Sequence, residues 1–141
     1  MRQALAALVL MFGFAGPGWA QTELSAADRA AIRTVITQQI EAFQHDDGEA
    51  AFAFASRSIQ EQFGGPDRFL TMVRRAYPAV HRPRAVDFSE LLLGNDTVVQ
   101  QVELVGPEGE AALALYSMER DPAGLWRISG CTLVKSARVG T

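Results

Sequence analysis

The sequence has few of the residues that hold disulfides, metals or cofactors. It contains one cysteine, Cys131, and two histidines, His45 and His81. One cysteine cannot form a disulfide within the chain or a multi-cysteine zinc site, and the histidines are too far apart in sequence for a recognisable ligand pair. The chain also lacks a glycine-rich nucleotide-binding motif and a nucleophile elbow. We therefore expect neither a metal site nor a cofactor.

Positive charge is also scarce. The 141 residues include 13 Lys and Arg against 16 Asp and Glu, which gives a formal net charge of −3. A nucleic-acid-binding surface needs a positive potential, so the charge balance argues against DNA or RNA as a partner. The chain is 48% hydrophobic and 21% charged, as in globular proteins, and its length corresponds to one domain.

The most hydrophobic segment, residues 4–14, is short. Its eleven residues fall below the roughly 20 that a membrane-spanning helix needs. Arg2 precedes it, and a helix-breaking Gly-Pro-Gly at 16–18 and the small residue Ala20 follow. This three-part pattern is typical of a secretory signal peptide cut after Ala20, and an N-terminal membrane anchor is the alternative. We expect a single α+β domain over residues 21–141, periplasmic or secreted, with no stable membrane span.

Helical periodicity dominates the first half of this domain. Ser25 and Asp28 form a capping pattern, and an apolar stripe follows at spacings of three and four: Ile32, Val35, Ile36, Ile40 and Phe43. The sequence His45-Asp46-Asp47-Gly48 ends this helix. We predict a second helix over 49–56, a further turn over 58–63, and a helix that begins at Pro66 and stops at Tyr77-Pro78.

From residue 84 onwards the hydrophobic period changes to two. Alternation and turn signals predict four strands, over 84–93, 97–105, 111–120 and 125–134, and a tail that frays. Strands joined by short turns form an antiparallel meander. Because the helices precede all the strands, the fold class is α+β, with N-terminal helices packed on a four-stranded antiparallel sheet.

Six segments between residues 32 and 133 together carry a family resemblance. They are Gln39-Ile40-x-Ala42-Phe43-x-x-Asp46-Asp47-Gly48, Ala51-Phe52-Ala53-Phe54-Ala55-Ser56, Ile59-Gln60-x-x-Phe63-Gly64, Phe69-Leu70-x-Met72-Val73, Tyr77-Pro78-x-Val80-x-Arg82-Pro83 and Trp126-Arg127-Ile128-x-Gly130-Cys131. These segments resemble a bacterial family catalogued as domain of unknown function 4864, although Arg57 stands where this family is expected to have proline.

That family is similar to the nuclear transport factor two-like, or cystatin-like, superfamily. The resemblance implies a cone in which helices pack against a curved antiparallel sheet. It implies no activity, because the wider fold hosts isomerases, dehydratases, cyclases and modules that only bind or dimerise. Function must therefore be argued from sites rather than from the fold.

The densest ionisable cluster is His45-Asp46-Asp47. Carboxylates and an imidazole carry out general acid–base catalysis when burial moves their pKa values towards neutrality. The alternative is that Asp46 or Asp47 accepts backbone N–H bonds at the start of the second helix.

Arginines gather in the segment 68–84, which also contains His81. Arg74, Arg75, Arg82 and Arg84 are candidates for binding a carboxylate or phosphate. The alternative is a solvated face with internal ion pairs. Arg74 and Arg75 suit the last turn of a helix in either case, and Arg82 and Arg84 flank Pro83, so we expect them to point apart.

Cys131 lies late in the last predicted strand. Strict alternation places its side chain on the face of Arg127, away from Trp126 and Ile128, unless a bulge at Gly130 reverses its direction. A free thiol in an exported protein is buried and inert, paired with another chain, or reactive.

Polar residues also alternate with apolar ones along the strands: Asp87, Gln100, Gln101, Glu103, Tyr116, Glu119 and Arg127. One sheet face must look into the cone. Tyr116 beside an ionised carboxylate on that face would resemble an isomerase or dehydratase site. Otherwise these residues line the outer, solvated or dimer-forming face, and register is not fixed by the sequence.

Two functions from different classes follow. The first is an exported, non-enzymatic domain that binds a small apolar or amphipathic ligand or a protein partner, as a homodimer formed through the exposed sheet. The alternative is a small lyase or isomerase that uses Asp46, Asp47, His81 and Tyr116 for general acid–base catalysis. An enzyme requires at least two of these residues to converge on a common cavity. A third hypothesis is that the domain has a structural role and tethers other components of the cell envelope.

Overall fold

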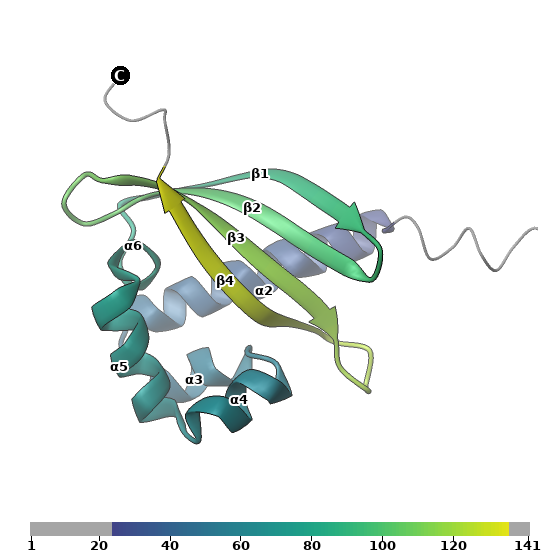
Figure 1. Ribbon diagram of the computed structural model, residues 1–141, viewed down its shortest axis with the longest axis horizontal. Coiled ribbons are helices and arrows are strands. Elements are labelled where there is room, and N and C mark those ends of the chain that lie inside the picture. Colours follow the sequence, from purple (N-terminus) through teal and green to yellow (C-terminus); the bar gives the residue numbers. More distant parts are fainter. Residues whose placement is uncertain (1–23, 136–141) are drawn as a thin grey trace, which may run out of the picture.

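A computed structural model describes residues 24–135 of the chain. The predicted signal peptide and the predicted fraying tail beyond residue 135 lie outside this range. Five helices come first: α2 (Ala26–Gln44), α3 (Gly48–Ala53), α4 (Arg57–Phe63), α5 (Pro66–Ala76) and α6 (Pro78–His81). They lie on one side of the sheet that follows, and no described helix covers the other side (Figure 1). No helix in the described range combines the length and apolar character needed to cross a membrane.

The sheet has the predicted antiparallel topology. Its strands are β1 (Ala85–Gly94), β2 (Thr97–Val105), β3 (Ala111–Arg120) and β4 (Trp126–Lys135). They pair in the order β1-β2-β3-β4, each antiparallel to its neighbour, so β1 and β4 are edges and the sheet is not closed. The predicted fold class, helices packed on a four-stranded antiparallel meander, is thereby confirmed.

The core forms where the apolar stripe of α2 meets the inner face of the sheet. Ile32, Ile36 and Phe43 are at most 1% exposed, as are Val102 and Leu104 of β2. Alternation along β2 and β3 sends every second side chain into this core, as the two-residue period of a strand requires. The periodicities of the sequence therefore identify the buried faces of both layers.

Two elements differ from the prediction. Helix α3 ends at Ala53 because the next residues leave it to pair with β4. The backbone N–H of Ser56 donates to the Ile128 carbonyl at 2.8 Å, and that of Ile128 donates to Phe54 at 2.9 Å. Ser56 also caps α4 through its hydroxyl. Pro78 ends α5 but occupies the first turn of the short helix α6, which was not predicted.

Hydrogen bonds attach the start of α2 to the end of β3 and the start of β4. Ser25 and Asp28 form the predicted capping box. The Asp28 carboxylate also accepts hydrogen bonds from Arg120 at 2.8 Å and from the Trp126 ring at 3.2 Å, and Arg120 stacks over Trp126. These bonds hold the pKa of Asp28 below its ordinary value, the Trp126 bond being the largest cause. One carboxylate thus joins α2, β3 and β4.

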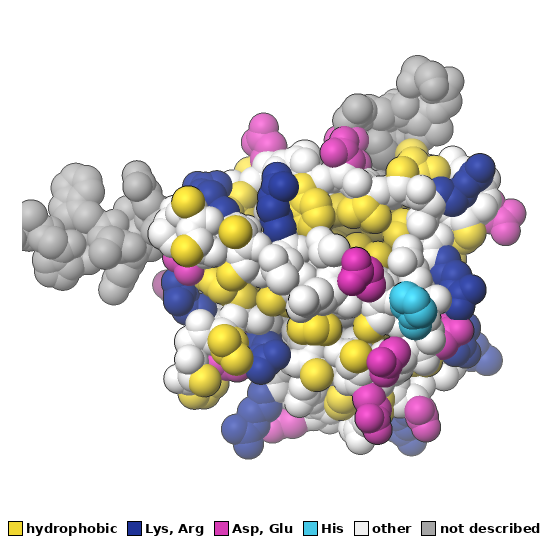
Figure 2. Space-filling model, turned by 180° about the vertical axis from the view of Figure 1, so that it is seen from behind, with side chains coloured by type: hydrophobic (Ala, Val, Ile, Leu, Met, Phe, Trp, Pro, Cys, Tyr) yellow, Lys and Arg dark blue, Asp and Glu magenta, His cyan; other side chains and the backbone are white. Residues whose placement is uncertain are grey.

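Charges of both signs are interspersed over the face seen from behind (Figure 2). Apolar side chains lie between them, and neither sign dominates that face.

Candidate functional site

A cavity of about 220 Å³ lies between the inner face of β3 and β4 and the helices. Its walls are mainly apolar: Phe43, Phe63, Phe69, Met72, Val80 and Ile128 belong to the lining. The Phe69 ring lies at the centre of an aromatic group, 5.8 Å from Phe43 and 5.5 Å from Phe63 between ring centroids. Such rings form a rigid apolar surface at small entropic cost.

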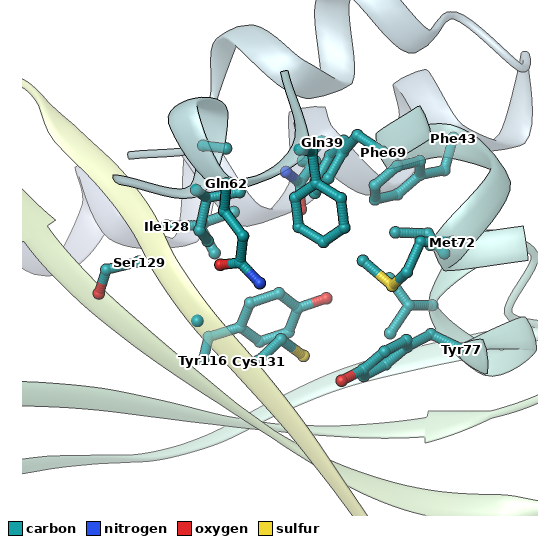
Figure 3. Close-up of a pocket in the computed structure, with 16 residues that line it drawn as sticks. Gln39, Phe43, Gln62, Phe69, Met72, Tyr77, Tyr116, Ile128, Ser129 and Cys131 are labelled. Atoms are coloured by element: carbon teal, nitrogen blue, oxygen red, sulfur yellow. The ribbon is translucent and has the colours of Figure 1, made fainter. Parts of the chain in front are cut away.

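The polar side chains of the lining are uncharged, and burial suppresses the ionisation of the one thiol among them. They are Gln39, Gln62, Tyr77, Tyr116, Ser129 and Cys131, and in Figure 3 all of them except Ser129 gather between β4 and the helices. No carboxylate, imidazole, lysine or arginine belongs to the lining that the structure describes. The cavity is therefore a neutral environment.

Tyr116 is the most unusual of these residues. Its side chain is 1% exposed, and its hydroxyl is the one buried side-chain oxygen or nitrogen without a hydrogen-bond partner in the described range. Burial, with a further contribution from the neighbouring Cys131, raises the pKa of Tyr116 well above its ordinary value. The hydroxyl therefore stays protonated and can donate. In Figure 3 it points from the sheet towards the helical side of the cavity.

The alternation of β3 explains the position of Tyr116. Ala112, Ala114, Tyr116 and Met118 all face inward. The alanines leave little side-chain volume beside the tyrosine, and Met118 continues the core beyond it. The strand therefore carries one large polar side chain on an otherwise apolar face.

A β-bulge determines the direction of Cys131. Ser117 pairs with Gly130 and Met118 pairs with Ile128, so Ser129 has no partner on β3. The extra residue shifts the alternation, and Cys131 lies opposite Tyr116 on the inner face. Strict alternation would have placed it outside, so that expectation is wrong, and the bulge alternative describes the strand.

Cys131 is half-buried, and its side chain lines the cavity. Burial raises its pKa from 9.0 to about 12, although a contact with Tyr116 opposes the rise. At neutral pH the thiolate, which is the reactive form, is therefore rare.

Gln39 contributes a second polar group from α2. Its amide nitrogen donates to the Ala51 carbonyl at 3.0 Å, which fixes the side chain and leaves its oxygen as an acceptor. Gln39 is 3% exposed and belongs to the same helix face as Ile32, Ile36 and Phe43. The sequence motifs do not identify Gln39 as a site residue, although a polar residue within an apolar stripe is a signal for one.

Asp46 and His81, predicted as catalytic candidates, contact each other. Asp46 Oδ1 lies 2.8 Å from His81 Nε2, and Asp46 Oδ2 accepts from Arg82 at 2.7 Å. Arg74 lies 3.6 Å from the same carboxylate. The hydrogen bond to His81 is the largest cause that holds the pKa of Asp46 below its ordinary value, followed by the nearby Arg82 charge. This cluster joins the ends of α2, α5 and α6, outside the lining of the cavity.

The other predicted site residues lie apart. Asp47 caps α3 by accepting a hydrogen bond from the Ala50 backbone at 3.1 Å. Arg75 and Arg84 are exposed and do not join the Asp46 cluster. The anion on which Arg74 and Arg82 converge is therefore a carboxylate of the chain itself.

The polar residues of the strands divide between the two faces. Tyr116 and Gln100 face inward, and the Gln100 amide donates to the backbone carbonyls at a bulge in β1. The others are exposed or half-buried, and alternation along the strands places them away from the core: Asp87, Gln101, Glu103, Glu119 and Arg127. No carboxylate of this set therefore accompanies Tyr116.

One solved structure supports this architecture. A protein of unknown function with a cystatin-like fold from Nostoc punctiforme aligns with a TM-score of 0.54 at 15% identity, over 83% of this chain and 97% of that chain. An NTF-2 like protein of unknown function from Burkholderia xenovorans aligns with a TM-score of 0.47 at 15% identity, over 80% and 88%. No curated protein matches the sequence. The family model of a domain of unknown function (DUF4864) matches residues 25–141, and the chain belongs to this family.

Proposed function

We propose that this domain binds a small, uncharged, mainly apolar molecule in the cavity beside β4, and that it acts by binding rather than by catalysis. The Tyr116 hydroxyl is the observation that carries the proposal. A buried polar group without a partner costs about 1–3 kcal/mol, and here it belongs to a residue that lines a cavity. A ligand that supplies the missing partner recovers this free energy.

The size of the cavity limits the ligand. A cavity of roughly 150 Å³ with apolar walls is known to bind benzene, and this one measures about 220 Å³. One ring with a small substituent, or a short branched chain, fits this volume. Met72 is a flexible part of the wall and allows modest adjustment to shape.

The lining also favours a neutral ligand. A buried ion without a counter-charge is strongly disfavoured, and the described lining contains no charged side chain. The lyase or isomerase alternative has less support for a related reason. General acid–base catalysis needs a base within hydrogen-bond reach of the substrate, whereas Asp46 and His81 contact each other outside the lining.

A thermal-shift experiment with one-ring neutral compounds tests the proposal. The Cys131→Phe variant places a bulky ring in the cavity, and Thr132→Phe makes the same change at the next, exposed position of β4. We expect wild type and Thr132→Phe to be stabilised, by about 1.4 kcal/mol at a ligand concentration of roughly ten times Kd, and Cys131→Phe to be unaffected. The absence of any shift in wild type, or equal shifts in all three proteins, would contradict binding in this cavity.

We also propose that the domain acts after export. The support is the signal-peptide pattern of residues 1–20. Mass spectrometry of the protein from periplasmic or secreted fractions should find Gln21 at the N-terminus. An intact Met1 in a membrane fraction would instead indicate an anchor.

A second copy of the chain is the proposed partner for the outer face of the sheet. Leu92, Val99, Leu113, Leu115 and Val134 form a stripe on that face, with Leu92 44% and Val134 41% exposed. A twofold axis through the stripe would bring identical apolar rows together. Light scattering should give a dimer mass for wild type and a monomer mass for Leu115→Lys. A monomeric wild type would overturn this proposal without affecting the cavity.

A further inference from the structure

We infer that the molecule bound in the cavity is a neutral carbonyl compound, whose oxygen accepts a hydrogen bond from Tyr116 while its apolar body packs against the phenylalanine rings. This inference rests on the proposed function and adds the chemical class of the ligand. It follows from the unpartnered hydroxyl of Tyr116 and from the uncharged, mainly apolar lining around it.

The lining has a free donor in a fixed position. Tyr116 has its ring buried between Ala114 and Met118 on the inner face of β3, so the hydroxyl has little freedom to seek another partner. Its pKa is raised by burial, which keeps the proton on the oxygen. The Cys131 thiol lies beside the hydroxyl and contributes to raising its pKa, but a thiol is a weak hydrogen-bonding group and makes no bond of hydrogen-bond geometry with it.

A carbonyl group fits this arrangement better than a hydroxyl or an amine. A carbonyl only accepts, so it satisfies Tyr116 and brings no hydrogen that needs a further acceptor. A ligand hydroxyl or amine also brings a donor, which would have to reach an acceptor such as the Gln39 oxygen on α2 while its own oxygen or nitrogen accepts from Tyr116. A carboxylate accepts equally well but places a negative charge in a lining without a described cation.

The apolar walls suit a flat ring next to that carbonyl. Phe69 makes a tilted contact with Phe43 and an edge contact with Phe63, and all three belong to the lining with Tyr116. Aromatic pairs prefer such geometries. Acetophenone, a single ring with a methyl ketone, is therefore an appropriate probe of the class.

The test compares probes of nearly identical shape by calorimetric titration. Isopropenylbenzene replaces the ketone oxygen of acetophenone with a CH₂ group, and benzoate replaces the ketone with a charged carboxylate. Three proteins are titrated: wild type, Tyr116→Phe, and Tyr77→Phe. The last is the matched control, because Tyr77 lines the same cavity but is not fully buried.

The quantity of interest is the ratio of the isopropenylbenzene Kd to the acetophenone Kd. This ratio cancels the general hydrophobicity of each probe between proteins. We expect it to be about tenfold larger in wild type and Tyr77→Phe than in Tyr116→Phe, which corresponds to about 1.4 kcal/mol. Benzoate should not bind. A lowered carbonyl stretching frequency of acetophenone bound to wild type is an independent readout that needs no variant.

The failures of the two proposals are distinguishable. If both neutral probes bind to wild type and the ratio is the same in Tyr116→Phe, the carbonyl inference is overturned and the proposed function stands. Benzoate binding as tightly as acetophenone would also overturn the inference. If no neutral probe binds to wild type, the proposed function fails and the inference fails with it.

Discussion

Removal of the Tyr116 hydroxyl should stabilise the ligand-free protein. Substitutions of fully buried residues usually destabilise, and most point mutations cost free energy. Tyr116→Phe is expected to be an exception, because the hydroxyl that it removes is buried and has no partner among the described residues, while the ring and its packing are retained.

The expected size follows from the cost of an unpaired buried group. That cost is about 1–3 kcal/mol, and water that enters the cavity would recover part of it. We expect the free energy of unfolding to rise by about 1 kcal/mol and the melting temperature by about 4 °C for a domain of this size. Urea unfolding and calorimetric melting measure the two quantities.

Tyr77→Phe provides the matched control. It removes a hydroxyl from the same cavity at a half-buried position, where water can hydrate it, so the change in stability should stay within about 0.5 kcal/mol. A loss of 1 kcal/mol or more in Tyr116→Phe, with Tyr77→Phe unchanged, would refute the reasoning. It would show that the Tyr116 hydroxyl has a partner in the ligand-free protein.

Three further predictions concern other parts of the chain. Asp28→Ala should lower the free energy of unfolding by about 1–2 kcal/mol in urea titrations, because it removes a capping box and the bonds to Arg120 and Trp126; a loss below about 0.5 kcal/mol would contradict the role of this carboxylate. Asp46→Asn should flatten the loss of stability in acid. The pKa of Asp46 lies below its ordinary 3.8, so its contribution to the free energy of unfolding is complete above pH 3.8 and disappears as the pH falls through the lower pKa of the folded state. An Asp46→Asn variant with the same pH profile of stability as wild type would contradict this contribution. Cys131, with a pKa of about 12 rather than 9.0, should react with iodoacetamide about a thousandfold more slowly than an exposed thiol; mass spectrometry gives the rate, and rapid labelling would count against burial.

Local pattern was sufficient for most of the fold. The stripe from Ile32 to Phe43 predicts α2 because a helix that packs on a sheet must bury one face every three or four residues. The turn signals between the strands predict the meander, because short connections leave only antiparallel pairing. These features depend on residues close together in the sequence, and the structure confirms them.

The features that form the cavity depend on contacts between distant residues. Gly130 indicated that a bulge could occur, but its register is set by pairing with Ser117. The early end of α3 depends on the pairing of Ser56 with Ile128, far along the chain. Each is a competition between local preference and tertiary pairing, which a single sequence does not resolve.

The sequence predicts the candidate site only in part, because contacts between distant residues also determine its geometry. The sequence indicates Tyr116 as a candidate site residue, but its inward direction depends on the register of β3 against both β2 and β4. The sequence marks Asp46 and His81 as candidates but contains no signal that they contact each other. Asp46 has a positive φ of 54°, and this turn at the end of α2 brings its carboxylate towards α6.

A crystal structure of the protein with acetophenone tests the central claim most directly. We expect one molecule in the cavity beside β4, with its carbonyl oxygen about 2.7–2.8 Å from the Tyr116 hydroxyl and its ring against Phe43 and Phe69. Density for the ligand only on the outer face of the sheet, or a cavity filled by rearranged side chains with Tyr116 bonded to the protein, would contradict it.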